Sequence, residues 1–189
     1  MKKMRKIFAV LLTLAMVLGM SMTSFAADAK ATITLKNFDK ANKVEYMQII
    51  QKDESTTSGW AFVNGAGACF TEALGLTDSA DAQQQIIWGL IQYKDATVKL
   101  PTGVTATTVT AANIDLALSK VAALTGFAEA TDKTKIEVSA AGIYAIKAEE
   151  TGFTYKTATA YVGFGEPYPA LTNAEVEAKK SSTDVDKTV

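Results

Sequence analysis

The stretch from Lys135 to Gly165 constrains the fold most, because its apolar residues recur at every second position. These residues are Ile136 and Val138, then Tyr144, Ile146 and Ala148 on one face, and then Ala158, Ala160, Val162 and Phe164 on the next apolar face. A period of two is typical of half-buried antiparallel strands, and it predicts two or three of them here. Such a group of strands is not stable alone in water, so the rest of the chain must supply a second layer.

The remaining segments place further strands at both ends of the chain and helices in the middle. We expect strands at residues 31–36, 43–50, 60–63 and 174–179, and helices at 69–76, 79–93 and 111–125. Ser79 and Thr110 supply N-cap chemistry for the second and third helices, and Gly126 ends the third. The fold class predicted is mainly β: the two groups of strands complete one sandwich, with a helical insertion between the early and late strands.

Residues 1–26 have the pattern of a secretory signal peptide. Four basic residues precede an apolar run from Ile7 to Leu18, and Ser24-Phe25-Ala26 offers the small residues that a signal peptidase reads. The run is too short and wrongly flanked for a membrane anchor. We therefore expect cleavage after Ala26, export, one domain over residues 27–179, and a polar linker over residues 180–189.

The composition excludes several functions. The signal peptide carries four of the 19 basic residues and none of the 20 acidic ones, which leaves a net charge of −5 on the exported part. Nucleic acid and anionic lipid are therefore poor candidate partners. The chain has no histidine and one cysteine, Cys69, so it has no Ser-His-Asp triad, no His-ligated zinc site and no internal disulfide. We expect no enzyme activity, no cofactor and no metal.

The order of elements resembles a known family of surface proteins. The chain opens with ATITLKNFDKANKVEYMQII, continues after the helices with GIYAIKAEE, and ends with EVEAKKSSTDVDKTV. This resembles the N-terminal domain of Gram-positive surface pilins and of related isopeptide-forming, sortase-anchored adhesins. The resemblance implies an immunoglobulin-like β-sandwich that serves as a structural or adhesive domain of a secreted, cell-wall-linked protein. The implied partners are a sortase and neighbouring pilin subunits; the alternative is an exported module that binds carbohydrate or a host protein.

The resemblance also implies a reactive lysine at the close of the last strand, and Lys179 occupies that position. A sortase transfers an acyl group to such an amine on the neighbouring subunit. Lys179 shares its parity with Glu175 and Glu177, opposite Val176, and this parity predicts that it lies on the solvent face.

The sequence departs from the family's fuller motif around that lysine. Ala178 stands where proline is usual, and Lys180 stands where asparagine is usual. The 189 residues also lack a C-terminal sorting signal. We therefore expect the chain to be either a fragment of a longer protein or not itself anchored.

The family's second chemistry is an internal Lys–Asn isopeptide bond assisted by a buried carboxylate. The candidates are Lys36, Glu150 (or Glu149) and Asn173. An apolar site favours the neutral amine and the protonated acid, which lets the amine attack the amide. Glu150 has the inward parity of Tyr144, whereas Lys36 and Asn173 need a bulge or a strand end to face inward. The alternative is that all three are ordinary surface residues.

Three other groups of residues suggest sites. Cys69 with one of Gln83, Gln84 or Gln85 suggests a thioester, although a small buried cysteine is the favoured interpretation. Asp78 and Asp81 suggest Ca²⁺, but their spacing fits helix capping better. The aromatic residues Trp60, Trp88, Tyr144 and Tyr161 suggest a sugar-binding groove, and core packing is favoured for them.

Overall fold

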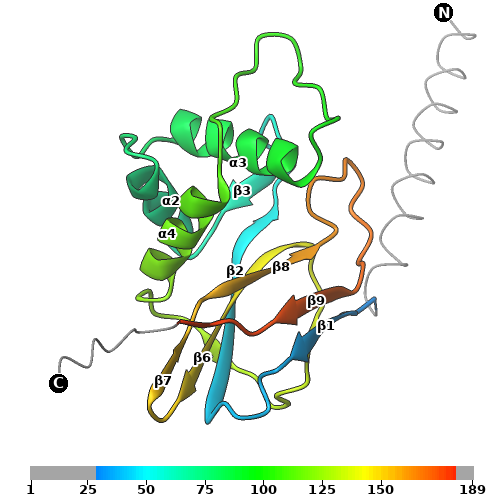
Figure 1. The fold of residues 1–189 in the computed structure, drawn as a ribbon. Coiled ribbons are helices and arrows are strands. Elements are labelled where there is room, and N and C mark those ends of the chain that lie inside the picture. Colours follow the sequence, from blue (N-terminus) through cyan, green and yellow to red (C-terminus); the bar gives the residue numbers. More distant parts are fainter. Residues whose placement is uncertain (1–28, 182–189) are drawn as a thin grey trace, which may run out of the picture. The chain divides into compact units, whose positions relative to one another are not determined.

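The structure, a computed structural model, describes residues 29–181 and contains two β-sheets and three helices in that range (Figure 1). The predicted signal peptide and residues 182–189 of the predicted linker lie outside the described residues. In chain order the elements are β1 (Ala31–Lys36), β2 (Lys43–Lys52), β3 (Trp60–Phe62), α2 (Ala66–Ala73), α3 (Ala80–Lys94), α4 (Ala111–Val121), β4 (Ala128–Glu129), β5 (Lys135–Val138), β6 (Gly142–Glu150), β7 (Phe153–Tyr155), β8 (Ala158–Val162), β9 (Ala174–Glu177) and β10 (Lys180–Ser181). The fold is mainly β, as the sequence predicts.

The strands form one small and one large sheet. In the small sheet β1 is central: it pairs antiparallel with β5 and parallel with β9, from Ile33 opposite Ala174 to Lys36 opposite Glu177. In the large sheet the order is β10-β7-β6-β2-β3, with β4 beside β2 and β8 beside β6. β1, the first strand of the domain, and β9, near its end, are therefore neighbours in the small sheet.

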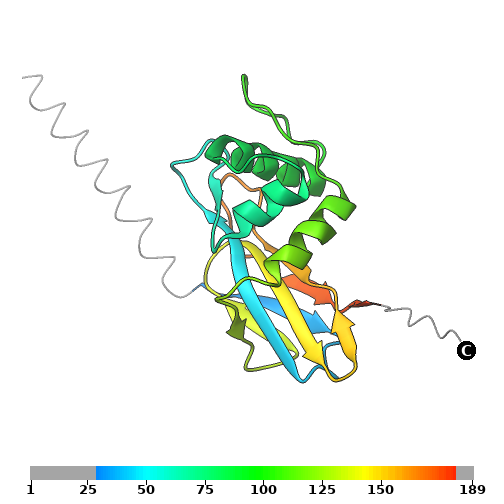
Figure 2. The same cartoon turned by 90° about the vertical axis from the view of Figure 1, so that its left-hand side faces the viewer.

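Strand β6 is buried on both faces, whereas its alternating pattern predicts a half-buried strand. Ile143 and Ala145 belong to a core that includes residues of α2, α3 and α4, which we call the helix-side core. Tyr144 and Ile146 belong to a second core with β1, β5 and β9, which we call the small-sheet core. The large sheet thus lies between the helices and the small sheet, and α2–α4 pack over part of its face (Figures 1 and 2).

The helix caps form where the sequence predicts them, and the helix boundaries shift by a few residues. The Ser79 side chain accepts a hydrogen bond from the Ala82 N–H at 3.1 Å, and Thr110 forms a capping box with Asn113. These contacts satisfy backbone donors that the first helical turn leaves open. Helix α2 begins at Ala66 instead of at Cys69, and α4 ends at Val121 instead of at Thr125.

Three expectations about the late part of the chain are wrong. Phe164 does not share a face with Val162: it packs in the helix-side core, because Gly163 between them has a φ of 61° and reverses the alternation. The predicted linker also starts too early, because Lys180 pairs with Tyr155 in the large sheet as the first residue of β10. The predicted last strand ends at Glu177, two residues before Lys179.

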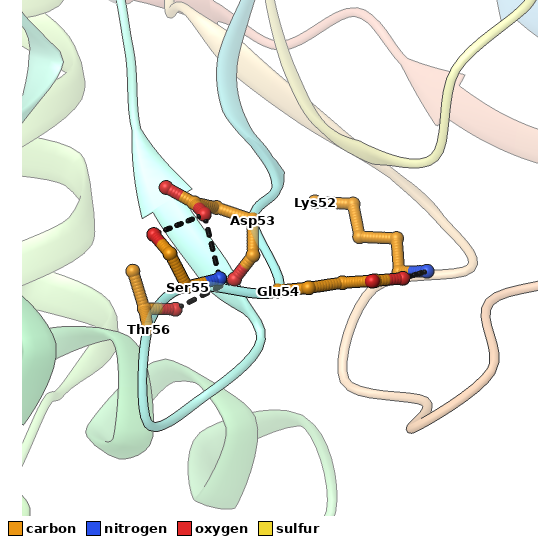
Figure 3. Close-up of polar contacts among 5 residues, drawn as sticks. All are labelled: Lys52, Asp53, Glu54, Ser55 and Thr56. Atoms are coloured by element: carbon orange, nitrogen blue, oxygen red, sulfur yellow. Dashed lines mark hydrogen bonds and ion pairs between the residues drawn. The ribbon is translucent and has the colours of Figure 1, made fainter.

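The polar loop between β2 and β3 is an ordered turn (Figure 3). The Asp53 carboxylate accepts hydrogen bonds from the Ser55 N–H at 2.9 Å and from the Ser55 hydroxyl at 2.6 Å. The Thr56 hydroxyl donates to the Asp53 carbonyl at 2.9 Å, and Lys52 forms an ion pair with Glu54. The hydrogen bonds from Ser55 hold the pKa of Asp53 below its usual value. The charged side chains of this loop therefore form their contacts within the loop, and these contacts do not indicate a ligand site.

The ionisation of Glu45 makes the stability of the domain depend on pH in the acid range. Its carboxylate lies 2.8 Å from Lys43 Nζ and 3.7 Å from Lys147 Nζ, and its side chain is only 12% exposed. The hydrogen bond with Lys43 is the main cause that holds its pKa below the ordinary 4.5. A lowered folded-state pKa contributes stability above the unfolded value, and this contribution is lost as the pH falls through the folded value.

We expect Glu45→Gln to flatten the acid limb of the stability curve. The measurement is the melting temperature between pH 7 and pH 3 for the wild type and the variant. Glu166→Gln, at an exposed loop position, is the matched control and should keep the wild-type slope. Equal acid slopes in Glu45→Gln and the wild type would contradict the assignment.

Candidate functional site

A groove of about 540 Å³ lies between α4 and the strands β8 and β9. Its lining is mixed, with charged, aromatic and apolar side chains. The residues are Tyr93, Ala111, Ile114, Asp115, Leu118, Lys156, Thr157, Ala158, Thr159, Tyr161, Glu175, Val176, Glu177 and Lys179. Its volume is in the range of ligand-binding clefts, and its lining is more charged than theirs usually is.

Lys179 lines the groove at the point where the chain crosses from the small sheet to the large one. Its own carbonyl accepts a hydrogen bond from the Lys156 N–H at 2.9 Å, between β7 and β8. The N–H of the preceding Ala178 donates to the Lys36 carbonyl in β1, also at 2.9 Å. The backbone on either side of the lysine is thus fixed to a different sheet, while its side chain is exposed. Glu175, Glu177 and Lys179 are exposed and Val176 is buried, as the predicted parity requires.

Lys179 differs from the other charged side chains of the groove in its contacts. The others have partners at these nitrogen-to-oxygen distances: Asp115 and Lys156 at 3.6 Å, Glu175 and Lys36 at 2.7 Å, and Glu177 and Asn37 at 2.9 Å. Lys179 has no such partner among residues 29–181. An amine without an ion pair is free to move toward an incoming group.

The structure does not bring the three isopeptide candidates together. Lys36 lies at one end of β1, opposite Glu177, whereas Asn173 accepts a hydrogen bond from the Thr32 N–H near the other end. Four residues along a strand span about 13 Å, much more than a direct bond permits. Glu150 lies in the other sheet, where it accepts a hydrogen bond from the Tyr155 hydroxyl. The geometry gives no support to a bond between Lys36 and Asn173.

The contact between Glu150 and Tyr155 predicts a titration. The hydrogen bond to the Glu150 carboxylate is the main cause that raises the pKa of Tyr155 to about 12. We expect Glu150→Gln to move this pKa back toward 10, because the negative charge that opposes the phenolate is gone. Tyrosine ring NMR as a function of pH measures it, and Tyr155→Phe identifies the resonance. An unchanged pKa in Glu150→Gln would contradict the assignment.

The thioester interpretation is not supported by the positions of the glutamines. Cys69 is buried in α2, and burial raises the pKa of its thiol. Gln83 packs against Gly67, and since two residues in a helix differ by about 200° in direction, Gly67 and Cys69 face different sides. Gln84 instead donates to the Trp60 carbonyl at 2.9 Å. The buried cysteine agrees with the favoured interpretation.

Asp78 precedes α3, whereas Asp81 lies in the first turn of the helix. Asp78 accepts a hydrogen bond from Gln83 at 2.7 Å, and Ser79 caps the helix. Within residues 29–181 no three histidine, cysteine or acidic side chains are arranged to hold a metal ion. Capping accounts for this segment.

The aromatic residues divide into core and groove. Trp60, Trp88 and Tyr144 are buried, as core packing predicts. Tyr161 instead lines the groove together with Tyr93, which is 48% exposed. Sequence analysis missed Tyr93, because its i+7 spacing from Ile86 places it at the edge of the apolar face of α3, where a core role is the ordinary interpretation.

Sequence analysis also missed Asp115 and Lys156, which come from segments that only the packing brings together.

No helix in the described part of the chain is both long and apolar enough to cross a membrane. No protein-family model matches the chain, and no curated protein matches it either.

Proposed function

We propose that the chain is a structural domain of a secreted, cell-wall-linked surface protein of the pilin or adhesin type, and that Lys179 is the lysine that a sortase joins to a neighbouring subunit. The observation that carries the proposal is the position of Lys179. Its backbone is fixed to both sheets, and its exposed amine lies in a groove without a partner among the described residues. The two sheets that enclose the small-sheet core also suit an immunoglobulin-like sandwich, in which α2–α4 form an insertion between β3 and β4.

The acyl transfer from the sortase requires a positioned lysine amine on this chain more than it requires further catalytic groups there. The acyl group arrives as a thioester of the sortase cysteine. The neutral Lys179 Nζ attacks the acyl carbon, the carbon–sulfur bond breaks, and the thiol leaves with the proton that the amine loses. An amide bond forms, and no oxidant or cofactor takes part. A fixed backbone reduces the entropy that the amine loses on reaching the thioester.

The test is the identity of the cross-linked lysine in the cells that produce the protein. We expect Lys179→Arg to abolish covalent oligomers that survive boiling in detergent, because arginine keeps the charge but does not form the amide. Lys36→Arg and Lys156→Arg, at exposed lysines near the groove, are matched controls and should leave the oligomers intact. Mass spectrometry of wild-type oligomers should locate the branch at Lys179. Oligomers that persist in Lys179→Arg would overturn the proposal.

A second candidate function is carbohydrate binding, which the two tyrosines of the groove favour. Tyr93 and Tyr161 lie in the same groove as the carboxylates of Asp115 and Glu175, and aromatic faces beside carboxylates suit a sugar. Binding on a glycan array that Tyr93→Ala abolishes would support this function. Tyr168→Ala, at an 85% exposed tyrosine outside the groove lining, is the control and should keep any binding. An array without binding would remove this candidate.

A further inference from the structure

Strand β5 is an open edge of the small sheet. It pairs with β1 on one side, and no strand among residues 29–181 pairs with its other side. Of the helices and strands in this range, only β1 lies closely alongside it. A groove of about 390 Å³ lies beside β5, and its lining includes Lys135, Ile136 and Glu137. An edge strand of this kind presents backbone N–H and C=O groups to which another strand can pair.

The pairing with β1 determines which residues of β5 direct their backbone groups outward. The Leu35 N–H donates to the Thr134 carbonyl at 2.8 Å, and the register continues along β5 without a shift. Backbone groups alternate in direction along an antiparallel strand. Those of Ile136 therefore point toward β1, as the carbonyl of Thr134 does, and those of Lys135 and Glu137 point away from it.

The side chains of β5 carry opposite charges on either side of a buried residue. Lys135 and Glu137 are about half exposed, at 51% and 49%, and the Lys135 Nζ lies 3.7 Å from the Glu137 carboxylate. Ile136 between them is 4% exposed and belongs to the small-sheet core. The edge thus has a positive and a negative side chain two positions apart on its solvent face.

We propose that two copies of the chain associate through this edge, with β5 of each copy pairing antiparallel about Ile136. In this register Lys135 lies opposite Glu137 of the second copy, and Glu137 lies opposite its Lys135. Both positions direct their backbone groups outward, so the two pairs can form the hydrogen bonds of an antiparallel ladder. Two small sheets then become one continuous sheet.

A second copy fits this edge because the charges of β5 are complementary to themselves in that register. Opposite charges directly across an antiparallel pair stabilise it, and like charges destabilise it. A register centred on Lys135 or on Glu137 places like charges opposite each other and is therefore disfavoured. The inference goes beyond the proposed function and does not rest on it, since Lys179 lines a different groove.

The test is sedimentation equilibrium of the exported chain, residues 27–189. A pair of four-residue strands buries less area than a standard interface, so the association is weak and requires protein concentrations up to about 0.5 mM. We expect the wild type to form dimers in this range. Lys135→Glu and Glu137→Lys each place like charges opposite each other in both pairs. Either variant alone should raise the dissociation constant at least about tenfold.

Mixing the two variants tests the register itself. In an equimolar mixture each pair again joins an amine to a carboxylate, so we expect dimers to return to the wild-type level. The double variant Lys135→Glu/Glu137→Lys should also associate as the wild type does. Across β1 both positions face neutral residues, Thr34 and Thr32, so the charge reversals leave the small sheet intact, which melting temperatures can verify.

A control separates the paired charges from the net charge. Lys99→Glu, at an exposed position in the α3–α4 loop, changes the net charge as much as Lys135→Glu does and should keep wild-type association. A wild type that stays monomeric over the whole concentration range would overturn the inference. A mixture of the two variants that associates no better than either variant alone would overturn it as well. The mapping of the cross-linked lysine is independent of both outcomes.

Discussion

Gly89→Ala is expected to lower the free energy of unfolding by about 3 kcal/mol, even though alanine is the better helix former. A Cβ at Gly89 in α3 would lie 2.0 Å from the Thr107 carbonyl oxygen and 2.9 Å from a methyl group of Val109. The Thr107 N–H donates to the Gln85 carbonyl at 2.9 Å, so the segment before α4 lies directly on α3 at this glycine. The substitution therefore forces two backbone segments apart, and no side-chain rotation relieves the contact.

The measurement is the melting temperature, which we expect to fall by roughly 6–12 °C. Gly103→Ala is the control: nothing lies within 4 Å of its added Cβ, and only the strain of a φ of +81° remains. That strain costs about 1 kcal/mol. A Gly89→Ala protein as stable as the Gly103→Ala protein would contradict the close approach.

Ile33→Ala is expected to cost a similar amount, about 3 kcal/mol, and to loosen one core selectively. Ile33 is fully buried at the centre of β1, opposite Ile136 on one side and Ala174 on the other. Its side chain belongs to the small-sheet core, so its loss leaves a cavity between the two sheets. We expect faster hydrogen exchange in β1, β5 and β9 than in the helices.

Ile87→Ala is the matched control for this prediction, because Ile87 is fully buried in the helix-side core. It should cost as much and should instead loosen α2–α4. Melting curves and hydrogen exchange by segment distinguish the two variants. The same exchange pattern in both would show that the two cores do not respond separately.

The sequence predicts those features that depend on near neighbours. β1 is found at its predicted bounds because strict alternation and a polar turn at Asn37 define it. Ser79 and Thr110 begin their helices because a capping hydroxyl acts within three residues. Lys179 is exposed as strand parity predicts, although β9 ends two residues before it.

Features that depend on packing were not predictable in this way. Alternation in β6 gives two faces but does not say what covers each, so its burial by helices on one face was missed. Phe164 changes sides through a single glycine φ angle. In the groove, Tyr93, Asp115 and Lys156 come from three separate segments, and no spacing within the sequence indicates that they meet.

The crossover at Lys179 also determines how the domain would respond to a pulling force. If tension enters through an amide at the Lys179 side chain and leaves along the chain after Ser181, it passes through two peptide units. The short pairing of β10 with β7 would be the first contact to separate, because it lies directly on that path. The long pairings of β1 with β9 and of β2 with β6 lie to one side of it. In a fibre linked through this lysine, the tension would therefore not pass through the two cores of the domain. The domain would then need no internal cross-link to withstand that tension.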